Sequence, residues 1–237
     1  MKTPFKIFAV CATFVCASAL LLLSAAADAA PILNGSFETP TVPVGGFTSF
    51  ASGSNAITDW TVVGPSGSSV AIVSGTFTQF GFTFPAQNGV QWLDLTGVGS
   101  NTTAGVQQTV ATTPGALYDL SFFVGNISNP GGLFGTTSTI GVQIDGGPVA
   151  PFTNSGGVGS TSLVWQQFTL PFTATAATTS ITFINQDPSG DNNNGLDNDS
   201  LTLGQSTGVP ESASTLFLLA TGLLGLLGYG RIVTGDL

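Results

Sequence analysis

The chain has 237 residues, a formal net charge of −9 and no histidine. No lysine or arginine occurs between Lys6 and Arg231, so the sequence excludes Ser-His-Asp and Cys-His catalysis, Schiff-base chemistry and phosphate-binding lysine loops. Its negative charge also makes nucleic acid an unfavourable partner, whereas divalent cations are natural counterions. We therefore expect a protein that is not an enzyme.

The chain begins with a short basic segment, an apolar run over residues 7–23 and a group of small residues. This order is typical of a secretory signal peptide, which we assign to residues 1–29. A first membrane-spanning helix is the alternative. Both cysteines, Cys11 and Cys16, lie in this segment, so the processed protein would have no disulfide.

Residues 31–208 are numerous enough for one domain with a hydrophobic core. Short segments in which apolar and polar residues alternate are separated by clusters of Gly, Pro and Asn, a pattern that favours an all-β sandwich or barrel. We predict a jelly-roll-like β-sandwich, with Asp145-Gly146-Gly147 as a hairpin turn. The predicted strands cover residues 60–62, 80–84, 91–95, 104–110, 117–124, 139–144, 150–153, 165–170, 180–185 and 200–203.

A second apolar run covers residues 213–230 and ends at Arg231. As a helix, this run would extend roughly 27 Å, close to the thickness of the hydrocarbon core of a bilayer. We predict a membrane-spanning helix here, preceded by a short polar signal made of Val209, Pro210 and Glu211.

The polar signal, the apolar run and the terminal arginine together resemble the PEP-CTERM sorting tail of certain Gram-negative bacteria. The resemblance implies that residues 209–237 are a sorting tail, processed by an exosortase-type enzyme in organisms that make exopolysaccharide. The protein would then be held transiently in the inner membrane before it reaches the outer surface or the extracellular matrix. Ser212 replaces the second proline of the family, and Arg231 stands alone in place of a basic cluster. A plain C-terminal membrane anchor is the alternative.

Three motifs between these ends occur in the order found in galactose-binding-like jelly rolls. They are Leu33-Asn34-Gly35-Ser36-Phe37-Glu38-Thr39-Pro40, then Gly105-Val106-Gln107-Gln108-Thr109-Val110 with Pro114-Gly115 after it, and Leu196-Asp197-Asn198-Asp199-Ser200-Leu201. The chain resembles this group over most of residues 33–203. The group includes many carbohydrate-binding modules and a plant cell-wall domain family of poorly defined function, so the resemblance implies association with carbohydrate.

The same resemblance implies a structural calcium ion, held by Glu38 and Asp197 where the two ends of the domain meet. Calcium takes six to eight oxygen ligands, and carboxylates with loop carbonyls suit it. The loop of residues 187–195 offers further oxygen donors for a second site, although it lacks the EF-hand arrangement. The alternative is that this loop only builds the turn before the last strand.

A sugar ring would stack on an aromatic side chain. Trp60, Trp92 and Trp165 are the largest candidates, but all three lie in predicted strands, where tryptophan usually belongs to the core. Trp60 follows Asp59 near a loop and is therefore the predicted ligand-binding residue if one tryptophan is exposed. Four nearby phenylalanines form either a buried strand face or an exposed patch, namely Phe77, Phe80, Phe82 and Phe84.

We therefore expect an exported, non-enzymatic surface or matrix protein that associates with carbohydrate, in particular with exopolysaccharide. A structural matrix protein bridged by calcium, with no glycan ligand, is the alternative. A glycosidase is a third class, because two carboxylates suffice to hydrolyse a glycosidic bond. The spacing of the acidic residues selects no such pair.

Overall fold

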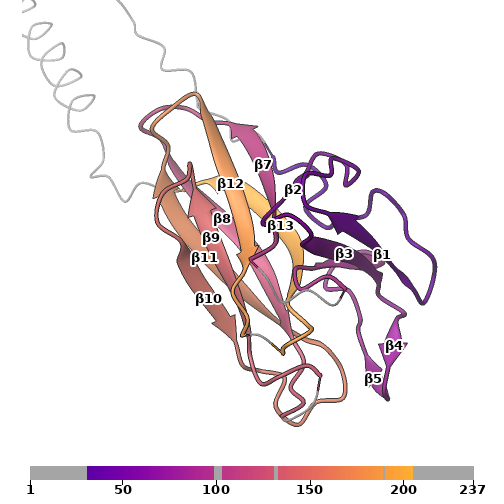
Figure 1. Cartoon of the computed structure of the whole chain (residues 1–237). Coiled ribbons are helices and arrows are strands. Elements are labelled where there is room, and N and C mark those ends of the chain that lie inside the picture. The colour runs from indigo at the N-terminus through magenta and orange to yellow at the C-terminus, as the bar shows by residue number, and fades with distance from the viewer. Residues whose placement is uncertain (1–30, 99–102, 131–132, 189, 205–237) are drawn as a thin grey trace, which may run out of the picture.

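The computed structural model describes residues 31–98, 103–130, 133–188 and 190–204. In these ranges the strands form two antiparallel sheets that pack face to face, and a two-stranded hairpin lies beside them (Figure 1). The predicted all-β sandwich is confirmed. The expected signal peptide (1–29) and sorting tail (209–237), including Val209, Pro210 and Glu211, lie outside the described residues. Within the described ranges, no helix is long and apolar enough to cross a membrane.

The larger sheet has six strands in the order β1-β3-β6-β13-β8-β11. Its strands are β1 (Phe47–Ala51), β3 (Ser69–Ser74), β6 (Gln91–Asp94), β13 (Gly195–Leu203), β8 (Leu117–Asn126) and β11 (Val164–Thr173). The last strand of the domain, β13, lies in the middle of this sheet between β6 and β8. The C-terminal acidic motif is therefore surrounded by earlier segments of the chain.

The smaller sheet has five strands in the order β10-β9-β12-β7-β2. Its strands are β10 (Ala150–Asn154), β9 (Ser138–Ile144), β12 (Thr178–Asn185), β7 (Gly105–Ala111) and β2 (Thr61–Val63). The predicted hairpin between β9 and β10 is confirmed. Asp145 and Gly146 have positive φ angles of 50° and 69°, as a tight turn that matches the strand twist requires.

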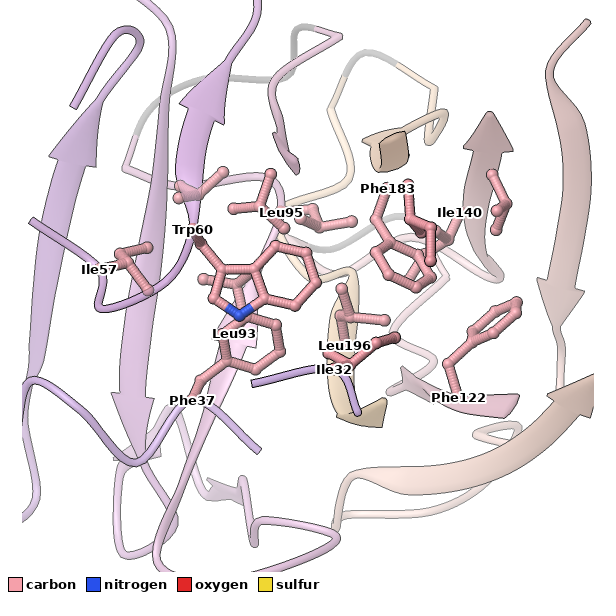
Figure 2. Packing of buried hydrophobic residues seen from close by; sticks show 14 of the residues in the cluster. Ile32, Phe37, Ile57, Trp60, Leu93, Leu95, Phe122, Ile140, Phe183 and Leu196 are labelled. Carbon is pink, nitrogen blue, oxygen red and sulfur yellow. The ribbon is translucent and has the colours of Figure 1, made fainter. Parts of the chain in front are cut away.

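The main hydrophobic core fills the space between the two sheets (Figure 2). The larger sheet contributes Leu93, Phe122 and Leu196, and the smaller sheet contributes Ile140 and Phe183. Along β8 buried side chains alternate with half-buried ones, as expected for a strand with one face on the core. Burying one such side chain contributes roughly 1.5–3 kcal/mol to the free energy of unfolding.

A second hydrophobic cluster covers the outer face of the larger sheet around β3 and β6. It consists of Ala71, Val73, Phe84, Trp92, Ile127, Phe134 and Leu163. Because this cluster and the main core bury both faces of β3, the strand reads as continuously apolar instead of alternating. β3 therefore lacks the alternation that predicts a strand, and β1, four of whose five residues are exposed, was not predicted either.

The predicted strand over residues 80–84 is wrong. β4 (Thr78–Gln79) and β5 (Phe82–Thr83) form a hairpin instead. Phe80 and Gly81 turn the chain with positive φ angles of 51° and 83°. Phe80 therefore lies at the hairpin tip with 75% of its surface exposed, whereas Phe84 is 2% exposed. The turn preference of glycine overrides the alternation of the phenylalanines.

Candidate functional site

A pocket opens on the outer face of the larger sheet, next to the second hydrophobic cluster. Its volume is about 280 Å³, near the lower end of the range of about 300–1,000 Å³ for small-molecule sites. We call it the aromatic pocket. Its aromatic lining consists of Phe47, Phe77, Phe84, Trp92 and Phe134, and its polar lining of Gln79, Asp94, Asn192 and Asn193.

The aromatic rings of the pocket support one another. Phe47 meets Phe77 edge to face, with ring centroids 5.7 Å apart, and Phe77 lies 5.5 Å from Phe84. Phe84 stacks on Trp92 at 6.4 Å, and the indole Nε1 of Trp92 donates a hydrogen bond to the Phe84 carbonyl at 3.1 Å. Trp92 is only 1% exposed, whereas Phe47 is 42% exposed. The aromatic surface offered to a ligand is therefore mainly phenylalanine.

The polar side of the pocket centres on Asp94, the last residue of β6. Its Oδ1 accepts hydrogen bonds from the backbone N–H and the hydroxyl of Thr96, at 3.0 and 2.8 Å, and from the N–H of Asn194 at 3.2 Å. These bonds lower the pKa of Asp94, but burial outweighs them and raises it to about 6. In the described part of the chain, the buried Oδ1 of Asn193 has no hydrogen-bond partner.

Trp60 does not belong to the pocket. Its side chain is 2% exposed and packs in the main core, 5.4 Å from Phe37 and 6.1 Å from Phe183 between ring centroids (Figure 2). Its Nε1 donates to the carbonyl of Asn34 at 3.1 Å. A buried indole has no face on which a sugar can stack, so the prediction that Trp60 binds the ligand is wrong. The sequence feature that indicated burial of Trp60 was the alternation of apolar and polar residues in residues 60–62.

Glu38 and Asp197, the predicted calcium ligands, converge on the loop between β5 and β6. Each carboxylate accepts two backbone N–H groups here: Glu38 from Val90 at the end of the loop and Gln91 at the start of β6, at 2.8 and 3.1 Å, and Asp197 from Gln87 and Asn88 of the loop, at 2.8 and 3.0 Å. Burial raises the pKa of Asp197 to about 7, and the negative charge of Glu38 adds to this rise. The two acids are therefore neighbours, although residues 39–196 separate them in the chain.

Asp199 joins this pair, and the sequence analysis did not single it out. Its N–H donates to the Gly35 carbonyl at 2.8 Å. Neither of its buried carboxyl oxygens has a hydrogen-bond partner among the described residues. Burial, and then the charge of Asp197, raise the pKa of Asp199 well above its usual value. The sequence feature that could have indicated Asp199 is the Asp-Asn-Asp spacing of residues 197–199. Strand pairing is irregular between Asp197 and Ser200, so the alternation of side chains does not by itself predict on which face of the sheet Asp199 lies.

These three acids fit calcium in the chemistry of their donors, because all their side-chain atoms that can bind a ligand are oxygens. The unpartnered oxygens of Asp199 are the kind of group that a bound cation would satisfy. In the described ranges, however, no three His, Cys, Asp or Glu residues form a group that could hold a metal ion together. A calcium ion bound among these acids would therefore depend on backbone carbonyls and water for most of its ligands.

The chain belongs to a family of proteins of unknown function, DUF642, whose profile matches residues 30–197. Among curated proteins, no sequence matches the chain. The expected PEP-CTERM tail lies beyond the matched residues.

Several solved structures are similar to the chain at low sequence identity. One is an exo-β-1,3-galactanase from Phanerochaete chrysosporium with β-1,3-galactotriose, at 18% identity and a TM-score of 0.37, where the match covers 68% of this chain and 30% of the galactanase. A family 35 carbohydrate-binding module from Clostridium thermocellum has 12% identity and a TM-score of 0.39, with 67% and 98% covered. A CBM4 structure has 16% identity and a TM-score of 0.37, with 73% and 99% covered. The chain thus spans less than a third of the galactanase.

Proposed function

We propose that this protein binds carbohydrate outside the cell and that the aromatic pocket is its glycan site. The observation that carries the proposal is the composition of the pocket, in which the exposed Phe47 and the half-buried Phe77 line the same space as Asp94 and Asn193. A sugar ring has an apolar face of C–H groups and a rim of hydroxyl groups. A site with both aromatic and polar walls matches both parts of such a ring.

The polar wall suits hydroxyl groups better than charged groups. Gln79 supplies an amide donor and acceptor. Asn192 supplies an acceptor oxygen, because its Nδ2 already donates to the carbonyls of Leu133 and Gly190. Asn193 Oδ1 is an acceptor that no protein group uses in the described part of the chain. Leaving such an acceptor unsatisfied costs about 1–3 kcal/mol, but Asn193 is only 1% exposed, so the amides of Gln79 and Asn192 are the groups offered to sugar hydroxyls. The described ranges contain no lysine or arginine. We therefore propose a neutral glycan as the ligand.

The proposed role is binding without hydrolysis. Glycoside hydrolysis uses two carboxyl groups on opposite sides of the bond. Among the described residues that line the pocket, Asp94 is the one carboxylic acid. Its Oδ1 already accepts three hydrogen bonds from the protein, which holds this side chain as part of the wall.

The proposal also includes the route to the cell surface and a structural cation. The signal peptide (1–29) would export the chain, and an exosortase-type enzyme would process the tail (209–237) so that the protein reaches the cell envelope or an exopolysaccharide matrix. A calcium ion at Glu38, Asp197 and Asp199 would neutralise these buried carboxylates and stabilise the loop between β5 and β6. Both parts rest on the sequence motifs and on the donor atoms described above.

The test is retention of the purified full-length chain, kept in mild detergent, on the immobilised exopolysaccharide of its source organism and on neutral glycans. Saturable retention that free sugar competes away is expected. Phe47→Ala should weaken it about tenfold, equivalent to about 1.4 kcal/mol. The matched control is Phe80→Ala, which removes an exposed phenylalanine that does not line the pocket. Equal retention of both variants contradicts the assignment of the pocket.

Absence of retention on every neutral glycan contradicts the proposed function itself. Calcium-driven self-association in that case, without any effect of glycan, would support the structural matrix protein instead.

A further inference from the structure

The loop between β12 and β13 contains polar side chains that are almost fully buried. Asp187, Asn193 and Asn194 are 8%, 1% and 0% exposed. One oxygen of each has no hydrogen-bond partner in the described part of the chain, namely Asp187 Oδ2, Asn193 Oδ1 and Asn194 Oδ1. Buried acceptors without donors are unfavourable, so three of them in one loop require a physical reason.

The amide of Asn194 has an orientation that its partners determine. The backbone N–H of Asp187 donates to Asn185 Oδ1 at 3.1 Å, which places an oxygen of the Asn185 amide at this position. Asn194 Nδ2 donates to the same oxygen at 2.7 Å and to the backbone carbonyl of Thr139 at 2.6 Å. Because both partners are acceptors, the nitrogen of Asn194 has to face them. Asn194 Oδ1 is therefore an acceptor that points away from these bonds.

Asp187 and Asn194 are held by the same two residues. The N–H of Thr139 donates to Asp187 Oδ1, and the carbonyl of Thr139 accepts from Asn194. Asn185 contacts both as well. The unpartnered Oδ2 of Asp187 and Oδ1 of Asn194 thus belong to side chains that are anchored side by side at the start of β9.

The surroundings of these two oxygens are negative. Burial, and then the charges of Asp191 and Asp94, raise the pKa of Asp187 to about 8, although the hydrogen bond from the N–H of Thr139 lowers it. Asp191 lies directly against Gly135, which faces it from the turn after β8. No lysine, arginine or histidine occurs within residues 31–204, so no basic side chain of the domain can neutralise these acids.

We propose that the β12–β13 loop binds calcium, with Asp187 Oδ2 and Asn194 Oδ1 as side-chain ligands. Calcium accepts carboxylate, amide and backbone carbonyl oxygens together with water in one coordination sphere. The absence of histidine and cysteine from the described ranges argues against zinc. This site is separate from the group of Glu38, Asp197 and Asp199, because it lies on a different loop and has its own hydrogen-bond partners.

The same loop forms part of the aromatic pocket. Asn192 and Asn193 line the pocket, and the N–H of Asn194 donates to Asp94 Oδ1 at 3.2 Å. A cation bound by Asp187 and Asn194 would therefore hold the polar wall in place. This consequence for glycan affinity rests on the proposed function, whereas the binding of calcium does not.

The test is calorimetric titration of the EDTA-treated full-length chain with calcium chloride at about pH 9, above the pKa of about 8 of Asp187, so that most of this carboxyl group has lost the proton that competes with the cation. Asp187→Asn should bind one calcium ion fewer than the unmodified chain. Asp145→Asn is the matched control, because it removes a negative charge from the exposed β9–β10 turn, and its stoichiometry should not change. Calcium at Glu38, Asp197 and Asp199 would count equally in all three proteins. The same stoichiometry in Asp187→Asn and in the control overturns the proposal.

Hydrogen exchange on the unmodified chain gives a test that needs no variant. Calcium should slow exchange in the peptide that covers residues 185–195, with no comparable change in the β9–β10 turn at residues 145–149, which is remote from the Thr139 anchor. Unchanged exchange in residues 185–195 overturns the proposal. Melting temperatures measured with added calcium and at lower pH distinguish a bound calcium ion from a bound proton at Asp187 Oδ2 and Asn194 Oδ1. A chain that gains thermal stability on acidification but gains none from calcium would carry a proton there, and this result also overturns the proposal.

Discussion

The two hydrophobic clusters of this protein contain the same kinds of side chain and differ in what covers them. In the main core, Trp60 is 2% exposed and packs among the side chains between the two sheets. On the outer face of the larger sheet, Trp92 is just as buried, but loops and a short hairpin cover it, and a pocket with a polar wall remains open. The comparison teaches that the covering elements, and not the aromatic residue itself, determine whether an aromatic cluster is closed or borders an open pocket.

The strongest test of this comparison removes an aromatic side chain from the closed core. Phe183→Ala should lower the free energy of unfolding by about 3–5 kcal/mol, because it leaves a cavity between the sheets. Phe183 is 0% exposed and contacts both Trp60 and Phe122. Chemical denaturation measures the loss. A loss no larger than that of the pocket variant Phe47→Ala would mean that the two clusters do not differ as described.

The next prediction concerns the polar wall of the open cluster. The pKa of Asp94 is about 6 in the folded protein against 3.8 for an unperturbed group, so folding binds a proton here. The stabilising contribution is therefore complete below about pH 3.8 and is lost as the pH rises through about 6. Between these limits the unmodified chain should lose about 3 kcal/mol that Asp94→Asn does not lose, given about 1.36 kcal/mol per pH unit. Denaturant titrations of both proteins in EDTA, at several pH values, measure the difference.

Parallel pH profiles for the two proteins would contradict the burial of Asp94. The asparagine retains an oxygen that can accept from Thr96 and Asn194, so the variant tests the charge while the hydrogen bonds remain possible.

A smaller loss of stability is expected at Gly135, where two of the loops that cover the second hydrophobic cluster meet. Gly135 has a φ of 63°, and a Cβ added there would collide with the carboxyl group of Asp191. Gly135→Ala should cost about 1–3 kcal/mol through backbone strain and this collision. Gly146→Ala is the control, since Gly146 has a φ of 69° with no atom near the added Cβ. Thermal melts should show the larger loss for Gly135→Ala. Equal losses would show that the strained backbone alone is responsible.

The smallest effect on stability is expected at the mouth of the pocket. Phe47→Ala should change the free energy of unfolding by less than about 1 kcal/mol, because 42% of the side chain is already in water. Glycan retention should nevertheless fall, as described above. A large loss of stability without a loss of retention would identify Phe47 as a packing residue and weaken the assignment of the pocket.

Local patterns were sufficient for much of the architecture. The alternation in β8 and the Asp-Gly turn between β9 and β10 identify these elements from neighbouring residues alone, and the structure contains both. The charge pattern also indicates a surface without basic groups. Where both faces of a strand are buried, as in β3, apolar and polar residues no longer alternate, so the sequence pattern does not predict the strand.

The chain by itself thus determined the sandwich and the exclusively acidic charge of residues 31–204, whereas the calcium site that the family resemblance implies at Glu38 and Asp197 stays a prediction. Only the tertiary structure decided that Trp60 is closed off, that the phenylalanines around the β4–β5 hairpin border a pocket, and that Asp187 and Asn194 present unpartnered oxygens. The reason is distance along the chain. Strands and turns follow from contacts between neighbours, whereas Asp197 binds a loop 110 residues earlier, and the position of such a loop depends on how both sheets and all their covering segments pack together.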